Sequence, residues 1–144
     1  MIIKEITEYG PQATRELDAL MRELSPRAAA TGERVRKVVE TPDMHLYAAF
    51  EEGRMVGCAT LCVCHTLEKA VGFVEAVVVT AAFRGRHIGR MLMERMVADA
   101  RLFGVQQLHL TSNPRREAAN GLYRALGFEK KETNVYIMDL HKSD

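Results

Sequence analysis

A glycine-containing turn between a strand-like run and a helix is the part of the sequence best suited to hold a charged ligand. The run 74–80 is rich in valine, the turn reads Arg84-Gly85-Arg86-His87-Ile88-Gly89-Arg90, and an apolar helical pattern follows it. The first backbone N–H groups of a helix have no partners within the helix, and the helix dipole places partial positive charge there. With arginines alongside, this turn predicts a binding site for a pyrophosphate group.

A second motif follows downstream and, together with the turn, resembles a known family. It reads Asn113-Pro114-x-x-Glu117-Ala118-Ala119-Asn120-x-Leu122-Tyr123-x-x-Leu126-Gly127-Phe128. The two motifs resemble the GCN5-related N-acetyltransferases, whose acetyl-CoA loop has the pattern Gln/Arg-x-x-Gly-x-Gly/Ala and whose later block is Asn-x-x-Ala/Leu-Tyr-x-x-x-Gly-Phe. His87 departs from this pattern, because it stands at the first glycine.

The resemblance implies acetyl-CoA as the co-substrate and places its binding site on both motifs. Main-chain groups of the valines before the loop would bind the pantetheine arm as though it were an extra strand, and the loop would bind the phosphates. The implied cofactor-binding residues are Val77, Val78, Val79, Arg84, Gly85, Arg86, His87, Ile88, Gly89, Arg90, Asn113, Asn120 and Tyr123.

Glu75 and Tyr123 are the candidate catalytic residues. Acetyl transfer from a thioester to an amine needs a neutral amine, a stabilised oxyanion and a proton for the departing thiolate. An alkyl amine has a pKa of roughly 10 and is mostly protonated at neutral pH, so Glu75 is the predicted base, directly or through water. By resemblance, Tyr123 would lie near the CoA sulfur and supply the proton. The alternatives are an exposed strand carboxylate and a tyrosine that only packs the last helix.

These residues predict an N-acetyltransferase in which a primary amine of a small molecule or peptide attacks acetyl-CoA directly, in a ternary complex. The alternative from another class is a non-catalytic acyl-CoA-binding or sensing module. A nucleotide-binding P-loop would need a lysine followed by Ser or Thr after the glycines, and Gly89-Arg90-Met91 does not supply it. The basic residues Arg27, Arg34, Arg36 and Lys37 indicate either a small acidic or phosphorylated acceptor or a solvated helix face.

The composition predicts one soluble, cytoplasmic domain over residues 1–144. The 20 basic and 19 acidic residues give a net charge of +1, which predicts no general attraction to nucleic acid or to an anionic membrane. No apolar run is long enough for a membrane span, and the N-terminus lacks the features of a secretory signal. Cys58, Cys62 and Cys64 share one strand face and are predicted to be buried free thiols, so we expect no metal. The family resemblance implies a homodimer.

The elements that would position these residues predict an α/β fold with a mixed sheet. About six or seven strands and about four helices are expected. The family resemblance implies the same fold, with the central parallel strands splayed apart at Val77–Val79 and Gln107–Leu110. Thr31 is expected to cap the second helix and Gly104 to end the third. The expected strands are 2–7, 46–50, 55–64, 69–80, 105–110, 128–131 and 135–140, and the expected helices begin at Pro11, after Thr31, at Ile88 and at Arg115.

Overall fold

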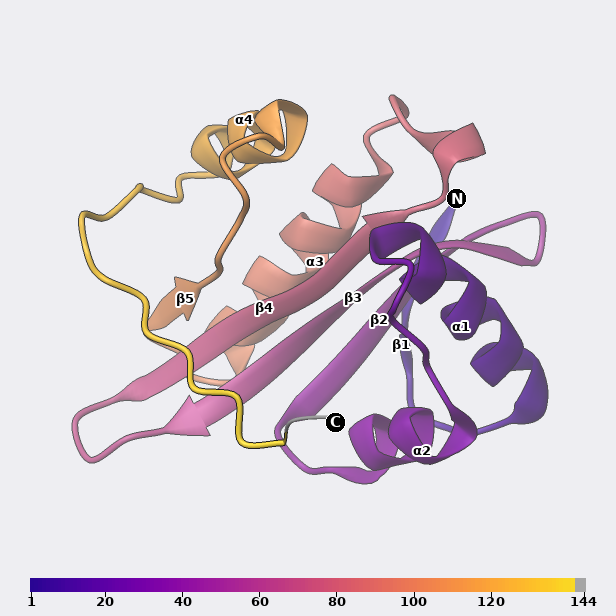
Figure 1. Cartoon of the computed structure of the whole chain (residues 1–144), viewed down its shortest axis with the longest axis horizontal. Coiled ribbons are helices and arrows are strands. Elements are labelled where there is room, and N and C mark those ends of the chain that lie inside the picture. Colours follow the sequence, from indigo (N-terminus) through magenta and orange to yellow (C-terminus); the bar gives the residue numbers. More distant parts are fainter. Residues whose placement is uncertain (142–144) are drawn as a thin grey trace. The chain divides into compact units, whose positions relative to one another are not determined.

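A sheet of five strands, in the order β1-β2-β3-β4-β5, organises the residues from Met1 to Thr111 (Figure 1). The computed structural model describes residues 1–141 and divides at Ser112 into two units, each of which is described by itself. The first four strands pair antiparallel, and β4 pairs parallel with β5. The strands are β1 (Ile2–Ile6), β2 (Met44–Glu51), β3 (Arg54–His65), β4 (Ala70–Val79) and β5 (Gln107–His109).

Helices cover both faces of this sheet. Figure 1 shows α1 and α2 on one face and α3 behind the sheet. The short 3₁₀ helix η1 connects β4 to the loop that precedes α3, and α4 belongs to the second unit. The helices are α1 (Pro11–Leu24), α2 (Gly32–Glu40), η1 (Ala81–Phe83), α3 (Ile88–Leu102) and α4 (Glu117–Ala125).

The helix boundaries and the hairpin turn lie where capping and turn residues in the sequence predict them. Pro11 is the first residue of α1, and the hydroxyl of Thr31 caps α2 by accepting a hydrogen bond from the Arg34 N–H at 3.2 Å. The hairpin between β2 and β3 turns at Glu52 and Gly53, whose φ angles of 50° and 77° are both left-handed, as a two-residue type I′ turn requires.

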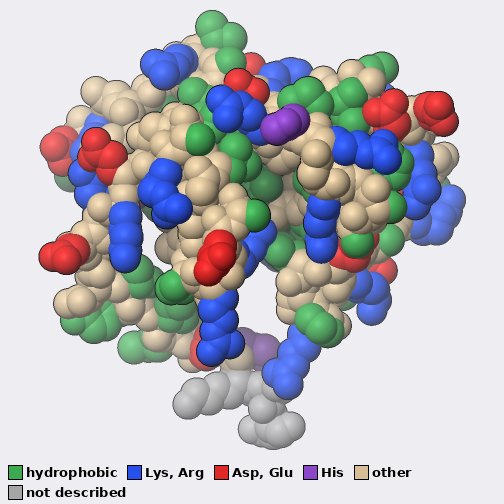
Figure 2. Space-filling view, turned by 90° about the horizontal axis from the view of Figure 1, so that it is seen from above, with side chains coloured by type: hydrophobic (Ala, Val, Ile, Leu, Met, Phe, Trp, Pro, Cys, Tyr) green, Lys and Arg blue, Asp and Glu red, His purple; other side chains and the backbone are tan. Residues whose placement is uncertain are grey.

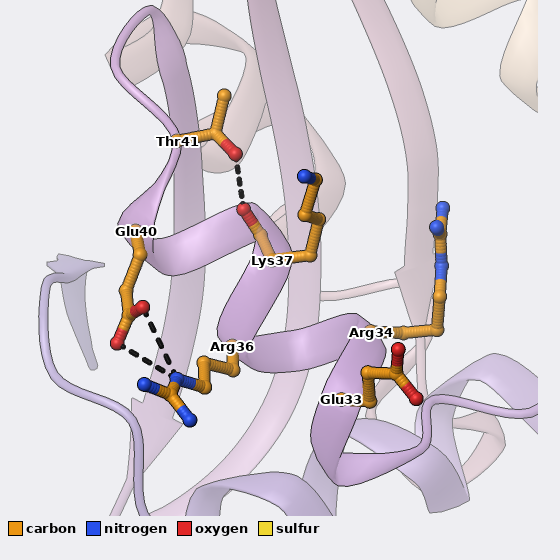
Figure 3. Close-up of a pocket in the computed structure, with 6 residues that line it drawn as sticks. All are labelled: Glu33, Arg34, Arg36, Lys37, Glu40 and Thr41. Atoms are coloured by element: carbon orange, nitrogen blue, oxygen red, sulfur yellow. Dashed lines mark hydrogen bonds and ion pairs between the residues drawn. The ribbon is translucent and has the colours of Figure 1, made fainter.

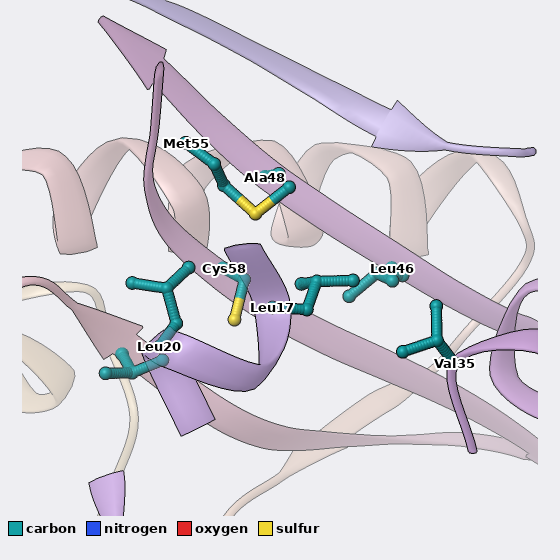
Figure 4. Packing of buried hydrophobic residues seen from close by; sticks show 8 residues of the cluster. Leu17, Leu20, Val35, Leu46, Ala48, Met55 and Cys58 are labelled. Carbon is teal, nitrogen blue, oxygen red and sulfur yellow. The ribbon is translucent and has the colours of Figure 1, made fainter. Parts of the chain in front are cut away.

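The core lies on both faces of the sheet. One face of the sheet is covered by Leu17 and Leu20 of α1 and by Val35 of α2 (Figure 4). The two leucines lie on the same side of α1 because they are three residues apart. Leu92 and Met96 of α3 are fully buried on the opposite face. The buried cluster under α1 and α2 comprises Leu17, Leu20, Val35, Leu46, Ala48, Met55, Cys58 and Val78.

A bulge in β4 changes which face its side chains occupy. Cys58 is opposite Val78 and Thr60 is opposite Glu75, so β4 has one more residue than β3 in this interval. Ala76 has a φ of 53°, a conformation that residues with a Cβ rarely adopt. Because of the extra residue, Glu75 and Val78 lie on the same face as α1, whereas regular alternation would put them on opposite faces.

The ladder between β4 and β5 is short and ends at the pair Phe73 and His109. The remainder of β4, from Val74 to Val79, has no strand partner on that edge in the described part of this unit. The predicted splay between the central parallel strands is therefore confirmed, and it leaves this edge of the valine segment without a strand partner.

The prediction of two strands near the C-terminus is wrong. Residues 128–131 and 135–140 form no strand, and the described residues 1–141 contain five strands where six or seven were expected. Alternating apolar residues suit a strand only when a neighbouring strand pairs with the backbone and a core takes up one face. Neither is present here, since Val135, Tyr136, Ile137 and Met138 are all at least 65% exposed.

The three cysteines differ in exposure. Cys58 is buried as expected and Cys62 is half-buried, but Cys64 is exposed, contrary to the expectation that all three are buried. Their even spacing does keep them on one strand face. The expectation was wrong for Cys64 because the end of β3 runs past the helices that cover this face (Figure 1).

The cysteine environments predict an order of alkylation. Burial raises the pKa of the Cys58 thiol to about 12, so it is neutral and shielded in the folded protein. Iodoacetamide at pH 8 should modify Cys64 first and Cys58 only after unfolding in denaturant, as measured by peptide mass spectrometry. Rapid modification of Cys58 in the native protein would contradict the burial of β3 under α1.

The surface carries charges of both signs. Figure 2 shows Lys and Arg side chains interspersed with Asp and Glu over the visible face, in keeping with the net charge of +1. Among the residues that the structure describes, none of the helices combines the length and apolar character needed to cross a membrane.

Candidate functional site

The loop before α3 presents unpaired backbone donors. Gly85 and His87 both have left-handed φ angles, of 81° and 63°, and the helix begins immediately afterwards at Ile88. The first hydrogen bond of the helix runs from the Met91 N–H to the His87 carbonyl at 3.0 Å, and no side chain caps this end. The N–H groups of residues 88–90 therefore have no partner in the helix and can bind an anion.

The backbone at His87 explains why the family pattern has glycine there. With φ at 63° and ψ at 20°, His87 occupies the left-handed helical region, which costs a residue with a Cβ about 1–2 kcal/mol. The loop thus keeps the conformation that the pattern implies, although the residue differs.

Replacing His87 with glycine should raise the free energy of unfolding by up to about 1 kcal/mol, because relief of the left-handed strain is partly offset by the greater entropy of glycine in the unfolded chain. Urea denaturation would measure this change. His87→Ala is the matched control, since it removes the imidazole and keeps the Cβ. Equal stabilisation by both variants would show that the imidazole, and not the backbone, is responsible.

The arginines of the loop have different environments. Arg84 donates a hydrogen bond from Nε to the Val79 carbonyl at 3.1 Å. The guanidinium of Arg86 lies 4.8 Å from the centre of the Phe83 ring, and Arg90 lies 3.8 Å from a Glu94 carboxylate oxygen. Arg84 is therefore held at the end of β4, whereas Arg86 stacks at the turn itself.

The valines before the loop combine buried or half-buried side chains with a backbone edge that β5 does not pair with. Val78 is 5% exposed and belongs to the core under α1, while Val77 and Val79 are half-buried. Hydrophobic side chains fix this segment in the sheet, and the backbone beyond the β5 ladder provides donors and acceptors for an extended ligand.

Glu75 is exposed on β4, beside an aromatic side chain that the sequence did not single out. Phe73, two residues earlier on the same face, is 39% exposed, and its ring centre lies 5.5 Å from that of His109 on β5. The strand register brings these two rings together, since Phe73 pairs with His109. Sequence spacing alone could not have identified this pair.

The second unit positions its own three predicted residues around α4. The side-chain amide of Asn120 donates to the Asn113 carbonyl at 3.1 Å, and the Asn113 side chain accepts from the Arg115 N–H at 2.9 Å. Tyr123 is 7% exposed, and its ring meets Phe128 edge-on at 6.0 Å. Burial raises the pKa of Tyr123, partly offset by the nearby Arg116 guanidinium, so the phenol keeps its proton at neutral pH.

Glu23 is a residue at this site that no motif indicated. It lies in the last turn of α1, and its carboxylate reaches the segment that joins β4 to the loop. A separation of 57 residues from its partner Thr80 leaves no local signal in the sequence.

An open depression of about 530 Å³ lies elsewhere, along α2 (Figure 3). Arg36 pairs with both carboxylate oxygens of Glu40 at 3.1 Å, and the Thr41 hydroxyl donates to the Lys37 carbonyl. All the lining residues come from one helix and its C-terminal cap, so no second element converges there. Over residues 1–141, no group of three or more His, Cys, Asp and Glu side chains is arranged to hold a metal ion.

A comparison with protein-family models identifies the chain. The model of the acetyltransferase (GNAT) family matches residues 10–128. The chain belongs to this family. It is therefore an acetyl-CoA-dependent N-acetyltransferase, and the matched range includes the strand, loop and helix at residues 74–102.

Individual relatives agree with this assignment. The chain is 31% identical over 117 residues to an "IAA acetyltransferase" of Azospirillum brasilense, covering 81% of this chain and 74% of the relative. An acetyltransferase structure from Trypanosoma brucei matches with a TM-score of 0.80 and 21% identity, over 95% of this chain and 98% of that one. An aminoglycoside N-acetyltransferase in complex with CoA matches with a TM-score of 0.80 and 17% identity, over 97% and 95% of the two chains.

Proposed function

We propose that this N-acetyltransferase transfers the acetyl group of acetyl-CoA to a primary amine of a small molecule or peptide, by direct attack in a ternary complex. The observation that carries the proposal is the start of α3, where a left-handed turn leaves three successive N–H groups, of residues 88–90, without partners in the helix. These donors, the helix dipole and the adjacent arginines suit the pyrophosphate of CoA.

The rest of the cofactor would lie along the free edge of β4. The backbone of Val77, Val78 and Val79 would bind the pantetheine arm by strand-like hydrogen bonds, because this edge has no partner from β5. In the second unit, Asn113 and Asn120 would contribute further contacts, as the matching positions do in the family. The two units would then act as one domain over residues 1–144, which the family match across their boundary supports.

Glu75 would act on the amine before it attacks, and Tyr123 would act on the thiolate as it leaves. Glu75, exposed beside Phe73, would take a proton from the ammonium group of the acceptor, directly or through water. The amine nitrogen would attack the thioester carbonyl, the C–S bond would break, and Tyr123 would give its proton to the CoA thiolate. The second proton that the nitrogen loses as the amide forms would return to the Tyr123 phenolate through water, which restores the phenol. A protonated phenol is what this role needs, and the burial of Tyr123 favours it.

The proposed acetyl acceptor is a primary amine. Solved structures with the same fold include enzymes described as aminoglycoside and glucosamine-6-phosphate N-acetyltransferases. The aromatic pair Phe73 and His109, next to Glu75, would form part of the binding site for the amine acceptor. We further propose a homodimer in the cytoplasm, as the family resemblance implies.

Two measurements test the proposal. Isothermal titration with acetyl-CoA, CoA and ATP should show micromolar binding of both CoA species and none of ATP. A panel of amines should then yield acetylated product in the presence of acetyl-CoA, detected by mass spectrometry because the exposed Cys64 would react with thiol reagents. Failure to bind either CoA species would refute the proposal, and binding without product from any amine would favour a non-catalytic acyl-CoA-binding module.

A further inference from the structure

The carboxylate of Glu23 connects α1 to the segment that enters the cofactor loop. One oxygen accepts a hydrogen bond from the Thr80 hydroxyl at 2.6 Å, and the other accepts from the Ala81 N–H at 2.9 Å. The guanidinium of Arg84 lies 3.9 Å from the second oxygen. Figure 1 shows the same proximity, with the end of α1 beside the end of β4.

These contacts act where the chain leaves the sheet. Thr80 is the residue before η1, and its side chain does not cap that helix. The Glu23 carboxylate does so instead, because it accepts the N–H of Ala81, the first residue of η1. The same carboxylate is paired with Arg84, whose Nε holds the Val79 carbonyl. One side chain of α1 thus contacts the connecting residues after β4 and the Arg84 side chain, which in turn binds the Val79 carbonyl at the end of β4.

We propose that Glu23 is a positioning residue that holds the cofactor loop in its CoA-binding conformation. The inference rests on the proposed function, since it concerns the same loop. Loss of the carboxylate would free η1 and Arg84 together, and the loop would have to be ordered when CoA binds. The cost of that ordering would appear as weaker binding of CoA, with little effect on the chemical step.

The electrostatics of the contact agree with its geometry. The pKa of Glu23 lies below its usual value, mainly because the carboxylate accepts the Thr80 hydrogen bond and then that of the Ala81 N–H. The carboxylate is therefore ionised at neutral pH, as both its hydrogen-bonding and its pairing with Arg84 require.

The test compares Glu23→Ala with a matched removal of a carboxylate elsewhere. Glu40→Ala is the control, because Glu40 lies on α2 and its ion pair within the described residues is with Arg36. Glu23→Ala should raise the dissociation constant of CoA and the KM for acetyl-CoA about tenfold, with kcat and the KM for the amine changed less than about twofold. Glu40→Ala should leave all four unchanged.

A second pair of variants keeps the test decisive if Glu23→Ala is poorly folded. Thr80→Ala removes the hydroxyl that donates to Glu23, and Thr80→Ser retains it. The alanine variant should weaken CoA binding about threefold, and the serine variant should restore it. A purely structural role would instead lower the melting temperature of Glu23→Ala and Thr80→Ala and leave the affinity of the folded protein for CoA unchanged.

The outcomes separate this inference from the proposed function. Normal CoA binding by Glu23→Ala and Thr80→Ala, alongside binding by the wild type, would overturn the role of Glu23 alone. A rise in the KM for the amine instead of that for acetyl-CoA would also overturn it. No CoA binding by the wild type would overturn the proposed function and this inference with it.

Discussion

Replacing Tyr123 with phenylalanine should lower kcat for acetyl transfer by about a hundredfold or more, because the thiolate would leave without a proton donor. The substitution removes one oxygen and keeps the ring that packs edge-on against Phe128. CoA affinity should change little. Steady-state kinetics with a saturating amine, together with titration of CoA, would measure both quantities.

Tyr136→Phe is the matched control for this prediction. Tyr136 is 88% exposed and lies outside both motifs, so its hydroxyl should be dispensable. A normal kcat in Tyr123→Phe would show that water or another group protonates the thiolate. Loss of CoA binding in that variant would instead assign Tyr123 to the binding site.

Replacing Gly89 with glutamate should weaken CoA binding by about a hundredfold. A carboxylate in the first turn of α3 would lie beside the proposed pyrophosphate, and two like charges about 5 Å apart repel by roughly 3 kcal/mol at an effective dielectric constant of about 20. An acidic residue at this end of a helix stabilises the helix itself, so the fold should remain intact. Calorimetric titration with CoA and circular dichroism would test affinity and folding separately.

Gly89→Ala is the control for that substitution, because the family pattern allows either residue at this position. It should bind CoA within about threefold of the wild type, since its added methyl carries no charge. If Gly89→Glu also bound CoA normally, the phosphates would not lie at the start of α3. Equal losses in both variants would point to a steric limit at this position.

These two substitutions address different steps of the proposed reaction. Gly89→Glu acts on binding of the co-substrate, and Tyr123→Phe acts on departure of the thiolate. Low activity of Gly89→Glu should therefore recover at high acetyl-CoA concentration, whereas that of Tyr123→Phe should not.

The sequence was most informative where neighbouring residues determine the structure. Pro11, Thr31 and Gly53 each placed an element boundary or turn correctly, because capping and turn geometry depend on residues within a few positions. The strand, loop and helix from Val74 to Leu102 were likewise predicted from local pattern. The family assignment rested on two such local motifs, and the family match confirmed it.

The sequence failed where a pattern needed a distant partner. Val135–Leu140 alternates like a strand, but no strand in the described part of the chain pairs with it, and the prediction was wrong. Cys64 was predicted to be buried with Cys58, but the helices that cover β3 do not extend over its end. Periodicity identifies which residues share a face, and only packing decides whether that face is covered.

By itself, then, the sequence determined the family, and it predicted the cofactor loop and the candidate residues Glu75 and Tyr123, because each is encoded by residue types at short spacing. Only the tertiary structure decided the bulge at Ala76 that turns Glu75 toward the α1 face, and the left-handed backbone that His87 adopts in place of glycine. It also brought the Glu23 carboxylate to Thr80 across 57 residues of sequence. Such contacts depend on how helices pack on a sheet, which no short stretch of residues specifies.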